Sequence, residues 1–182
     1  MNLPNKLSLF RVVIIPLFVL IYYIIGWTNQ SMYAYFLAPL FLIASFTDFL
    51  DGYIARKQNL VTVFGKFIDP LADKLLVMAA LIVLNALGFV PYWVTVVILS
   101  REFIVTGIRL VAVGDGKVIA ASKLGKYKTA STMVGIILML LYPYLQVFAD
   151  IGIWVVYLGT ALTIISGIDY FVKNKTIIMQ SM

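Results

Sequence analysis

The 182-residue chain contains no cysteine and no histidine. A disulfide framework, a thiol nucleophile and a cysteine-based zinc site are therefore excluded. An imidazole base and a histidine metal ligand are excluded as well. Any catalysis by this chain must use carboxylates, lysine or arginine, hydroxyl groups or a bound metal ion.

Charged residues are scarce, at 12% of the chain, whereas soluble domains average about 25%. Hydrophobic residues make up 63%, and the mean hydropathy is +1.02. A chain of this length forms one domain or one helical bundle, so the excess of apolar surface must face lipid. We therefore expect an all-α, polytopic membrane protein in which residues 1–182 form a single domain.

Charge-free runs long enough to cross about 30 Å of hydrocarbon, roughly 20 helical residues each, predict six transmembrane helices with short connections. Turn-forming clusters separate them. The predicted spans lie near 8–25, 33–55, 69–87, 91–112, 129–149 and 151–168.

Basic residues lie only on one side of this map. The loops near 26–32, 86–91 and 144–151 hold none of the fourteen lysines and arginines. The positive-inside rule then places both termini in the cytoplasm. The net charge of +6 is explained by attraction to anionic lipid at the membrane ends, so we do not expect nucleic acid as a partner.

Four aspartates lie close together in a region predicted to be near the membrane. Asp48 and Asp51 share one face of the second helix, and Asp69 and Asp73 share one face of the third. A short loop makes these helices antiparallel neighbours, so the four carboxylates can converge. Without a cation they would repel one another. With two hard divalent ions, Mg²⁺ or Mn²⁺, they form an all-oxygen site suited to phosphoryl displacement.

Simpler roles for single aspartates stay open at this point. Asp69 before Pro70 could be a helix N-cap, and Asp51 could pair with Arg56 or Lys57. Such a role is less easily extended to four aspartates on matched faces.

The pattern Asp48-x₂-Asp51-Gly52-x₂-Ala55-Arg56-x₈-Gly65-x₃-Asp69-x₃-Asp73 resembles the signature of the CDP-alcohol phosphotransferase family. The resemblance implies a homodimeric six-helix enzyme with its active site open to the cytoplasm. It implies that Asp48, Asp51 and Asp69 hold the metals and that Asp73, also near a metal, is the general base. Gly52, Ala55 and Arg56, with Gly65 beside them, would line the cytidine diphosphate site.

Three further stretches, 2–11, 100–103 and 122–129, are similar to the bacterial phosphatidylglycerophosphate synthases of that family. This likeness implies transfer of a phosphatidyl group from CDP-diacylglycerol to sn-glycerol 3-phosphate, with release of CMP, at a bacterial plasma membrane.

The acceptor carries a phosphate dianion, so its pocket needs cations. Arg109 is the first candidate because an unpaired guanidinium is costly within an apolar stretch. The other candidates are Arg101, Lys123, Lys126 and, less strongly, Ser8 and Arg11. The lysines could instead belong to a basic loop facing lipid, and Arg11 could extend to the headgroups. We interpret Glu102 beside Arg101 as an ion pair.

Two rival functions stay open. The same donor could serve another acceptor, such as inositol phosphate, serine or phosphatidylglycerol. Alternatively, the acidic cluster could be the transport site of a small cation transporter, although no internal repeat supports this.

Overall fold

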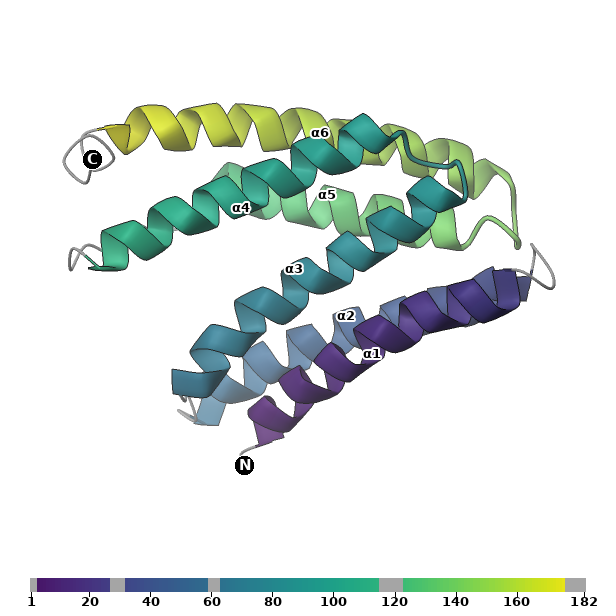
Figure 1. Ribbon diagram of the computed structural model, residues 1–182, viewed down its shortest axis with the longest axis horizontal. Helices are drawn as coiled ribbons and strands as arrows, with labels where there is room; N and C mark the ends of the chain where they lie inside the picture. Colours follow the sequence, from purple (N-terminus) through teal and green to yellow (C-terminus); the bar gives the residue numbers. More distant parts are fainter. Residues whose placement is uncertain (1–2, 27–31, 59–62, 115–122, 176–182) are drawn as a thin grey trace.

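Six α-helices, and no strand, make up the part of the chain that the structure, a computed structural model, describes (Figure 1). They are α1 (Leu3–Gly26), α2 (Met32–Gln58), α3 (Val63–Ala86), α4 (Tyr92–Gly114), α5 (Lys123–Leu140) and α6 (Val147–Lys173). The description covers the backbone of residues 3–26, 32–58, 63–114 and 123–175. For some of the predicted site residues only the backbone is described: Asp48, Asp51, Gly52, Ala55, Arg56, Gly65, Asp69 and Lys123. The predicted all-α class is confirmed.

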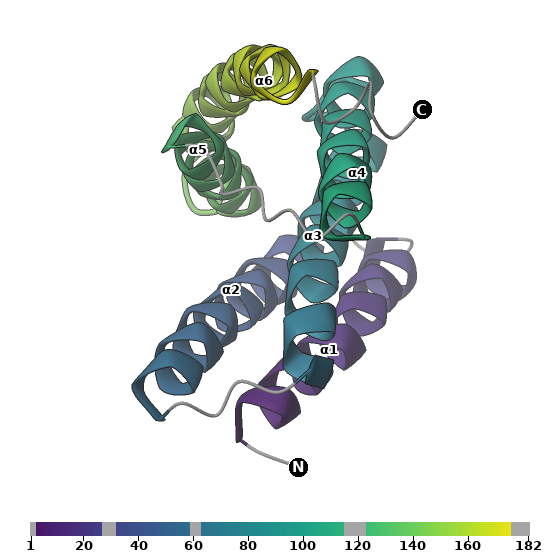
Figure 2. The same cartoon turned by 90° about the vertical axis from the view of Figure 1, so that its left-hand side faces the viewer.

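Consecutive helices run in opposite directions, so the ends of α1, α3 and α5 meet the starts of α2, α4 and α6 at one end of the bundle (Figure 1). Helices α1, α2 and α3 pack on one another, as do α5 and α6, and α6 also contacts α4. Figure 2 shows α3 between the pair α1 and α2 and the group formed by α4, α5 and α6. Helix α3 contacts α1 and α2 on one side and α4 and α5 on the other.

The turn between α3 and α4 has the residues that such a turn needs. Gly88 takes a φ of +78°, a conformation that glycine adopts without steric cost. The amide of Phe89 donates to the Leu84 carbonyl at 3.0 Å, and the Asn85 side-chain amide donates to the Val90 carbonyl at 2.7 Å. The break predicted at these residues is confirmed.

Helix α5 ends at Leu140, whereas the predicted span ran to residue 149; that boundary was wrong. Pro143 lies in the turn that follows, and it has no backbone N–H to donate to a helix hydrogen bond. Helix α6 begins at Val147 and has Asp150 in its first turn and Lys173 in its last. Both charges complement the helix dipole.

Helix α3 begins at Val63, six residues before the predicted start at Asp69. Asp69 therefore lies inside the helix, and the N-cap role that the sequence left open for it is wrong. Interior prolines do not end helices here, since Pro16 and Pro39 lie within α1 and α2.

Helices α5 and α6 approach closely through glycines. A Cβ added to Gly135 would lie 2.6 Å from Cγ2 of Val156 and 2.9 Å from the Gly152 carbonyl. A Cβ added to Gly152 would in turn lie 2.9 Å from the Gly135 carbonyl. Small residues that let backbones approach are a common means of helix packing in membranes.

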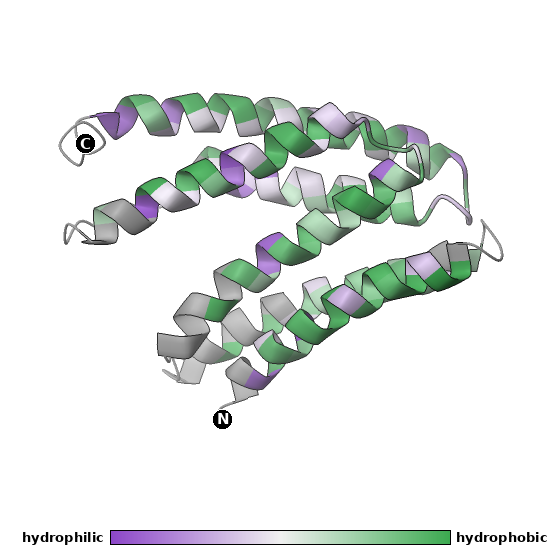
Figure 3. Cartoon of the chain, in the orientation of Figure 1, coloured by the Kyte–Doolittle hydropathy of each residue, from purple (hydrophilic) through white to green (hydrophobic). Residues whose placement is uncertain are grey.

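The apolar core lies between the helices, with Phe18, Phe41, Leu76, Leu84 and Met139 almost fully buried. Many large apolar side chains instead face outward, and hydrophobic residues run along much of α1, α4 and α6 in Figure 3. Among the described residues, two segments, Lys6–Ile25 and Val147–Lys173, are long and apolar enough to span a membrane.

Candidate functional site

The four aspartates of the sequence motif lie on two helix segments at one end of the bundle. Asp48 and Asp51 are the seventeenth and twentieth residues of α2, and Asp69 and Asp73 are the seventh and eleventh of α3. The end of α2 and the start of α3 lie at the same end of the bundle (Figures 1 and 2). The described residues contain no group of three acidic side chains that could hold a metal, and three of the four aspartate side chains lie outside them. The predicted convergence therefore stays a prediction.

Asp73, the fourth aspartate, forms an ion pair with Arg11 of α1, in which Nη1 of the arginine donates to Oδ1 of the carboxylate. The Arg11 side chain is fully buried, whereas that of Asp73 is 46% exposed. Arg11 thus lies inside the bundle. The alternative that the sequence left open, in which Arg11 extends to the lipid headgroups, is wrong. Asp73 is also one of the residues that line a cavity.

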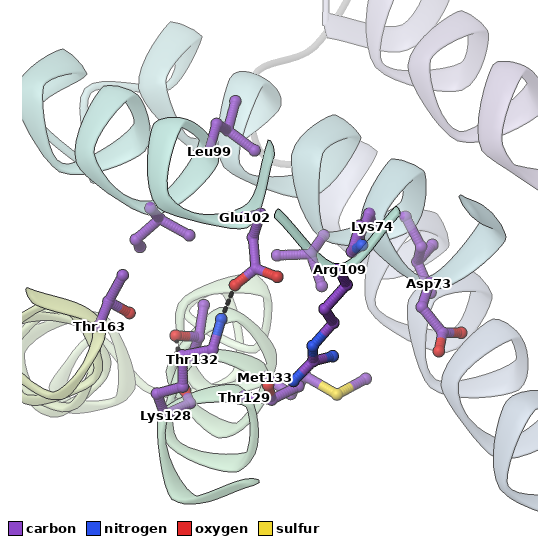
Figure 4. Close-up of a pocket in the computed structure, with 13 residues that line it drawn as sticks. Asp73, Lys74, Leu99, Glu102, Arg109, Lys128, Thr129, Thr132, Met133 and Thr163 are labelled. Carbon is purple, nitrogen blue, oxygen red and sulfur yellow. Dashed lines mark hydrogen bonds and ion pairs between the residues drawn. The ribbon is translucent and has the colours of Figure 1, made fainter. Parts of the chain in front are cut away.

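This cavity has a volume of about 240 Å³ and lies among α3, α4, α5 and α6 (Figure 4). Its polar lining residues are Asp73, Lys74, Glu102, Arg109, Lys128, Thr129, Thr132 and Thr163. Leu76, Val77, Ile98, Leu99 and Met133 supply the apolar part of the wall. A mixed lining of this kind is typical of small-molecule sites.

Arg109 extends from α4 into the cavity (Figure 4). Its Nε is buried without a hydrogen-bond partner, and its guanidinium carbon lies 5.5 Å from the centre of the Tyr170 ring. Within the described part of the chain Arg109 forms no ion pair. This arginine is therefore a cation available to a bound anion.

Lys74 follows Asp73 on α3 and also lines the cavity. Its ammonium donates a hydrogen bond to the hydroxyl of Thr106 on α4. That hydroxyl donates to the Glu102 carbonyl at 2.7 Å. Thr106 thus fixes the lysine between the two helices.

Glu102 points toward Lys128 of α5, and the two form an ion pair (Figure 4). Lys128 is only 5% exposed. The predicted pairing of Glu102 with Arg101 is also present, at 3.6 Å. Arg101 in addition donates to the Ser166 hydroxyl of α6 at 3.1 Å. These contacts connect α4 to both α5 and α6.

The other predicted acceptor residues are placed less directly. Arg101, Lys126 and the buried Ser8 are not among the described residues that line the cavity. Lys126 is exposed. Lys123 lies outside the described side chains, as do the four predicted donor-site residues, Gly52, Ala55, Arg56 and Gly65.

Lys74 and Lys128 were not singled out by the sequence prediction. For Lys128 a signal existed: residues two apart on a helix point about 200° apart, so Lys126 and Lys128 cannot face the bundle together. Lys74 could not be recognised as a cavity residue in the same way, because a lysine next to an acidic motif is readily interpreted as a counter-charge to that motif.

The chain matches the CDP-alcohol phosphatidyltransferase family model over residues 1–165. It is 48% identical to a Bacillus subtilis protein named CDP-diacylglycerol–glycerol-3-phosphate 3-phosphatidyltransferase, over 95% of both chains. A Rickettsia typhi protein of the same name is 41% identical over 96% of this chain and 98% of its own. A Mycobacterium tuberculosis protein named probable phosphatidylglycerophosphate synthase is 40% identical over 94% of this chain and 81% of its own. On these matches, the chain belongs to the CDP-alcohol phosphatidyltransferase family.

Proposed function

We propose that this protein transfers a phosphatidyl group from CDP-diacylglycerol to sn-glycerol 3-phosphate, giving phosphatidylglycerol phosphate and CMP in phospholipid synthesis. The names of relatives that are 40–48% identical over nearly the whole chain support this reaction. Those names also favour an enzyme over the cation transporter that an acidic cluster alone would allow.

The structural observation that carries the proposal is the cavity beside Asp73. It places a carboxylate and an arginine without an anionic partner among the described residues in one lining. A general base and a phosphate-binding cation are the two groups that a phosphorylated alcohol needs in order to react as a nucleophile.

Asp48, Asp51, Asp69 and Asp73 would hold two divalent cations, Mg²⁺ or Mn²⁺. The donor set fits such ions because carboxylate oxygens are the ligands that both prefer. When bound, the ions neutralise negative charge on the diphosphate of the donor. Gly52, Ala55, Arg56 and Gly65 would bind the cytidine diphosphate, with Arg56 forming forked hydrogen bonds to phosphate.

Asp73 accepts the proton of the attacking glycerol hydroxyl. The hydroxyl oxygen forms a bond to the lipid-side phosphorus, and the bond from that phosphorus to the bridging oxygen breaks. The electron pair leaves on CMP. Arg11 orients the carboxylate for this step through its ion pair. No histidine exists to take this role.

Arg109 would bind the acceptor phosphate. Further hydrogen bonds or positive electrostatic potential at this phosphate would come from Lys123, Lys126 and Arg101, with Ser8 and Arg11 as weaker candidates. Of these only Arg109 lines the cavity among the described residues, so its removal should have the largest effect.

We further propose that all six helices cross the membrane, that residues 1–182 form one domain and that the protein is a homodimer. Both termini and the active site would face the cytoplasm of a bacterium. The two apolar segments of α1 and α6 and the outward-facing apolar residues support a membrane location.

The test is CMP release by the full chain in detergent micelles with CDP-diacylglycerol and Mg²⁺ or Mn²⁺. The acceptors compared are glycerol 3-phosphate, glycerol, serine, inositol phosphate and phosphatidylglycerol. Glycerol 3-phosphate should be the preferred acceptor, and the product should be phosphatidylglycerol phosphate. Equal activity with glycerol, or preference for another acceptor, would overturn the proposed reaction.

A further inference from the structure

The charged groups of the cavity do not all have partners of opposite charge. Its lining holds three cations, Lys74, Arg109 and Lys128, and two carboxylates, Asp73 and Glu102. Glu102 pairs with Lys128, and Asp73 pairs with Arg11, which does not line the cavity. In the part of the chain described, neither Lys74 nor Arg109 forms an ion pair with a carboxylate.

The two remaining cations are close neighbours in the fold. The Lys74 ammonium is bonded to the Thr106 hydroxyl, and Thr106 precedes Arg109 by three residues on α4. Residues three apart share one face of a helix, about 5–6 Å between Cβ atoms. The Lys74 ammonium therefore lies close to the part of α4 that carries Arg109, where α3 and α4 pack together.

Two neighbouring cations in a partly apolar cavity are unfavourable, because burial removes water from both charges and the two repel each other. A bound dianion removes this cost by making charge-assisted hydrogen bonds to both groups. A phosphate monoester supplies two negative charges and three oxygens. The diphosphate of the donor is a second source of the same chemistry.

We propose that Lys74 binds the phosphate of the acceptor together with Arg109 and that Thr106 positions Lys74 for this contact. Lys128, neutralised by Glu102, is part of the cavity wall and not a ligand. The inference rests on the proposed function, whose acceptor is a phosphate monoester. It makes Lys74 a residue that determines specificity for phosphorylated over neutral alcohols.

The position of Lys74 fits the acceptor better than the donor. Lys74 is adjacent to Asp73 in the chain and lines the same cavity. The acceptor's phosphate and its reacting hydroxyl are joined by only three carbon atoms, so the phosphate site must lie close to the base. Lys74 satisfies this requirement by its place on α3.

The test is the kinetics of CMP release by Lys74→Met, with glycerol 3-phosphate and CDP-diacylglycerol varied in turn. Loss of one charged hydrogen-bond partner should raise the KM for glycerol 3-phosphate roughly 10- to 100-fold. The KM for CDP-diacylglycerol should stay within about twofold. Lys74→Arg, which keeps the charge, should recover most of the affinity.

Lys173→Met is the matched control. Lys173 is 69% exposed, pairs with Asp169 and does not line the cavity, so both KM values should be unchanged. Thr106→Val should raise the KM for glycerol 3-phosphate by a smaller factor, because the lysine loses its positioning bond. Thr106→Ser should restore it. These milder variants keep the test decisive if Lys74→Met does not fold.

Calorimetric titration of the wild type and Lys74→Met with glycerol 3-phosphate alone provides a second readout, with weaker binding expected in the variant. A rise confined to the KM for CDP-diacylglycerol would assign Lys74 to the donor and overturn the inference. Unchanged KM values in folded Lys74→Met would overturn it as well. If the wild type instead prefers another phosphorylated acceptor, the proposed function fails, whereas a Lys74 effect on the KM of that acceptor supports the phosphate site.

Discussion

Arg11 of α1 and Asp73 of α3 form an ion pair in which the arginine is fully buried and the aspartate is about half exposed. The two residues are 62 positions apart in the chain, so the pair connects two helices that only the fold brings together. The asymmetry of burial means that removal of the two partners should have different effects on stability.

Asp73→Ala should lower the free energy of unfolding more than Arg11→Met does. The first change leaves a buried guanidinium without this carboxylate, which costs up to about 3 kcal/mol. The second leaves a carboxylate that water can partly reach. Thermal unfolding in detergent measures both, and the double variant should be more stable than Asp73→Ala alone. Equal melting temperatures for the two single variants would contradict this prediction.

Catalysis should depend on the aspartates and on a divalent ion. Asp73→Asn should reduce CMP release at least about 100-fold, because loss of a general base costs 10²- to 10⁴-fold. Asp69→Asn should abolish metal-dependent release. Chelation of metal should stop the wild type, and Mg²⁺ or Mn²⁺ should restore it. Asp150→Asn, at an exposed position in the first turn of α6, is the control and should be fully active. Full activity of Asp69→Asn would exclude Asp69 as a metal ligand and contradict the proposed site.

The ion pair between Glu102 and Lys128 should behave as a coupled unit. Glu102→Gln and Lys128→Met should each destabilise the protein. The first leaves the buried Lys128 without this carboxylate, and the second leaves Glu102 with only its 3.6 Å contact to Arg101. A double-mutant cycle of unfolding free energies should give a coupling of about 1–3 kcal/mol. The neutral double variant should keep the KM for glycerol 3-phosphate within about threefold. Additive effects of the two changes on the free energy of unfolding would show that the ion pair does not stabilise the fold.

Close packing of α5 on α6 should make two glycines intolerant of a methyl group. Gly135→Ala and Gly152→Ala should each lower stability by about 1–3 kcal/mol, because the new Cβ meets backbone oxygen at 2.9 Å. Gly107→Ala on α4 is the matched control, since no heavy atom lies within 4 Å of its added Cβ. That change should be neutral or stabilise by roughly 0.5–1 kcal/mol. A stabilised Gly152→Ala would contradict the close approach.

The sequence predicted the number of helices and their class because charge-free runs and turn residues are local signals. The turn at Gly88 was found for this reason. The boundaries that depend on how far a helix continues past such signals were missed. Helix α3 starts before the Asp69–Pro70 pair that resembles a start signal, and α5 stops at Leu140 rather than at the next charge.

For the site, the spacing of the aspartates and the isolation of Arg109 in an apolar stretch could be read directly. Which cations have anionic partners could not. The ion pairs of Arg11 with Asp73 and of Lys128 with Glu102 join residues from different helices. Such pairs depend on helix rotation and packing, which a single sequence does not determine.

Two of the three tryptophans, Trp93 and Trp154, pack on Tyr157 with ring centres 6.0 and 5.8 Å away. Trp93 precedes Arg109 by sixteen residues on α4, about 24 Å along the helix axis. Intrinsic fluorescence from these two indoles therefore reports insertion and unfolding at that end, and not binding at Arg109. Because the chain has no native thiol, a cysteine introduced at Thr129, which is exposed and lines the cavity, would carry one dye beside the site and provide the optical signal that the indoles lack.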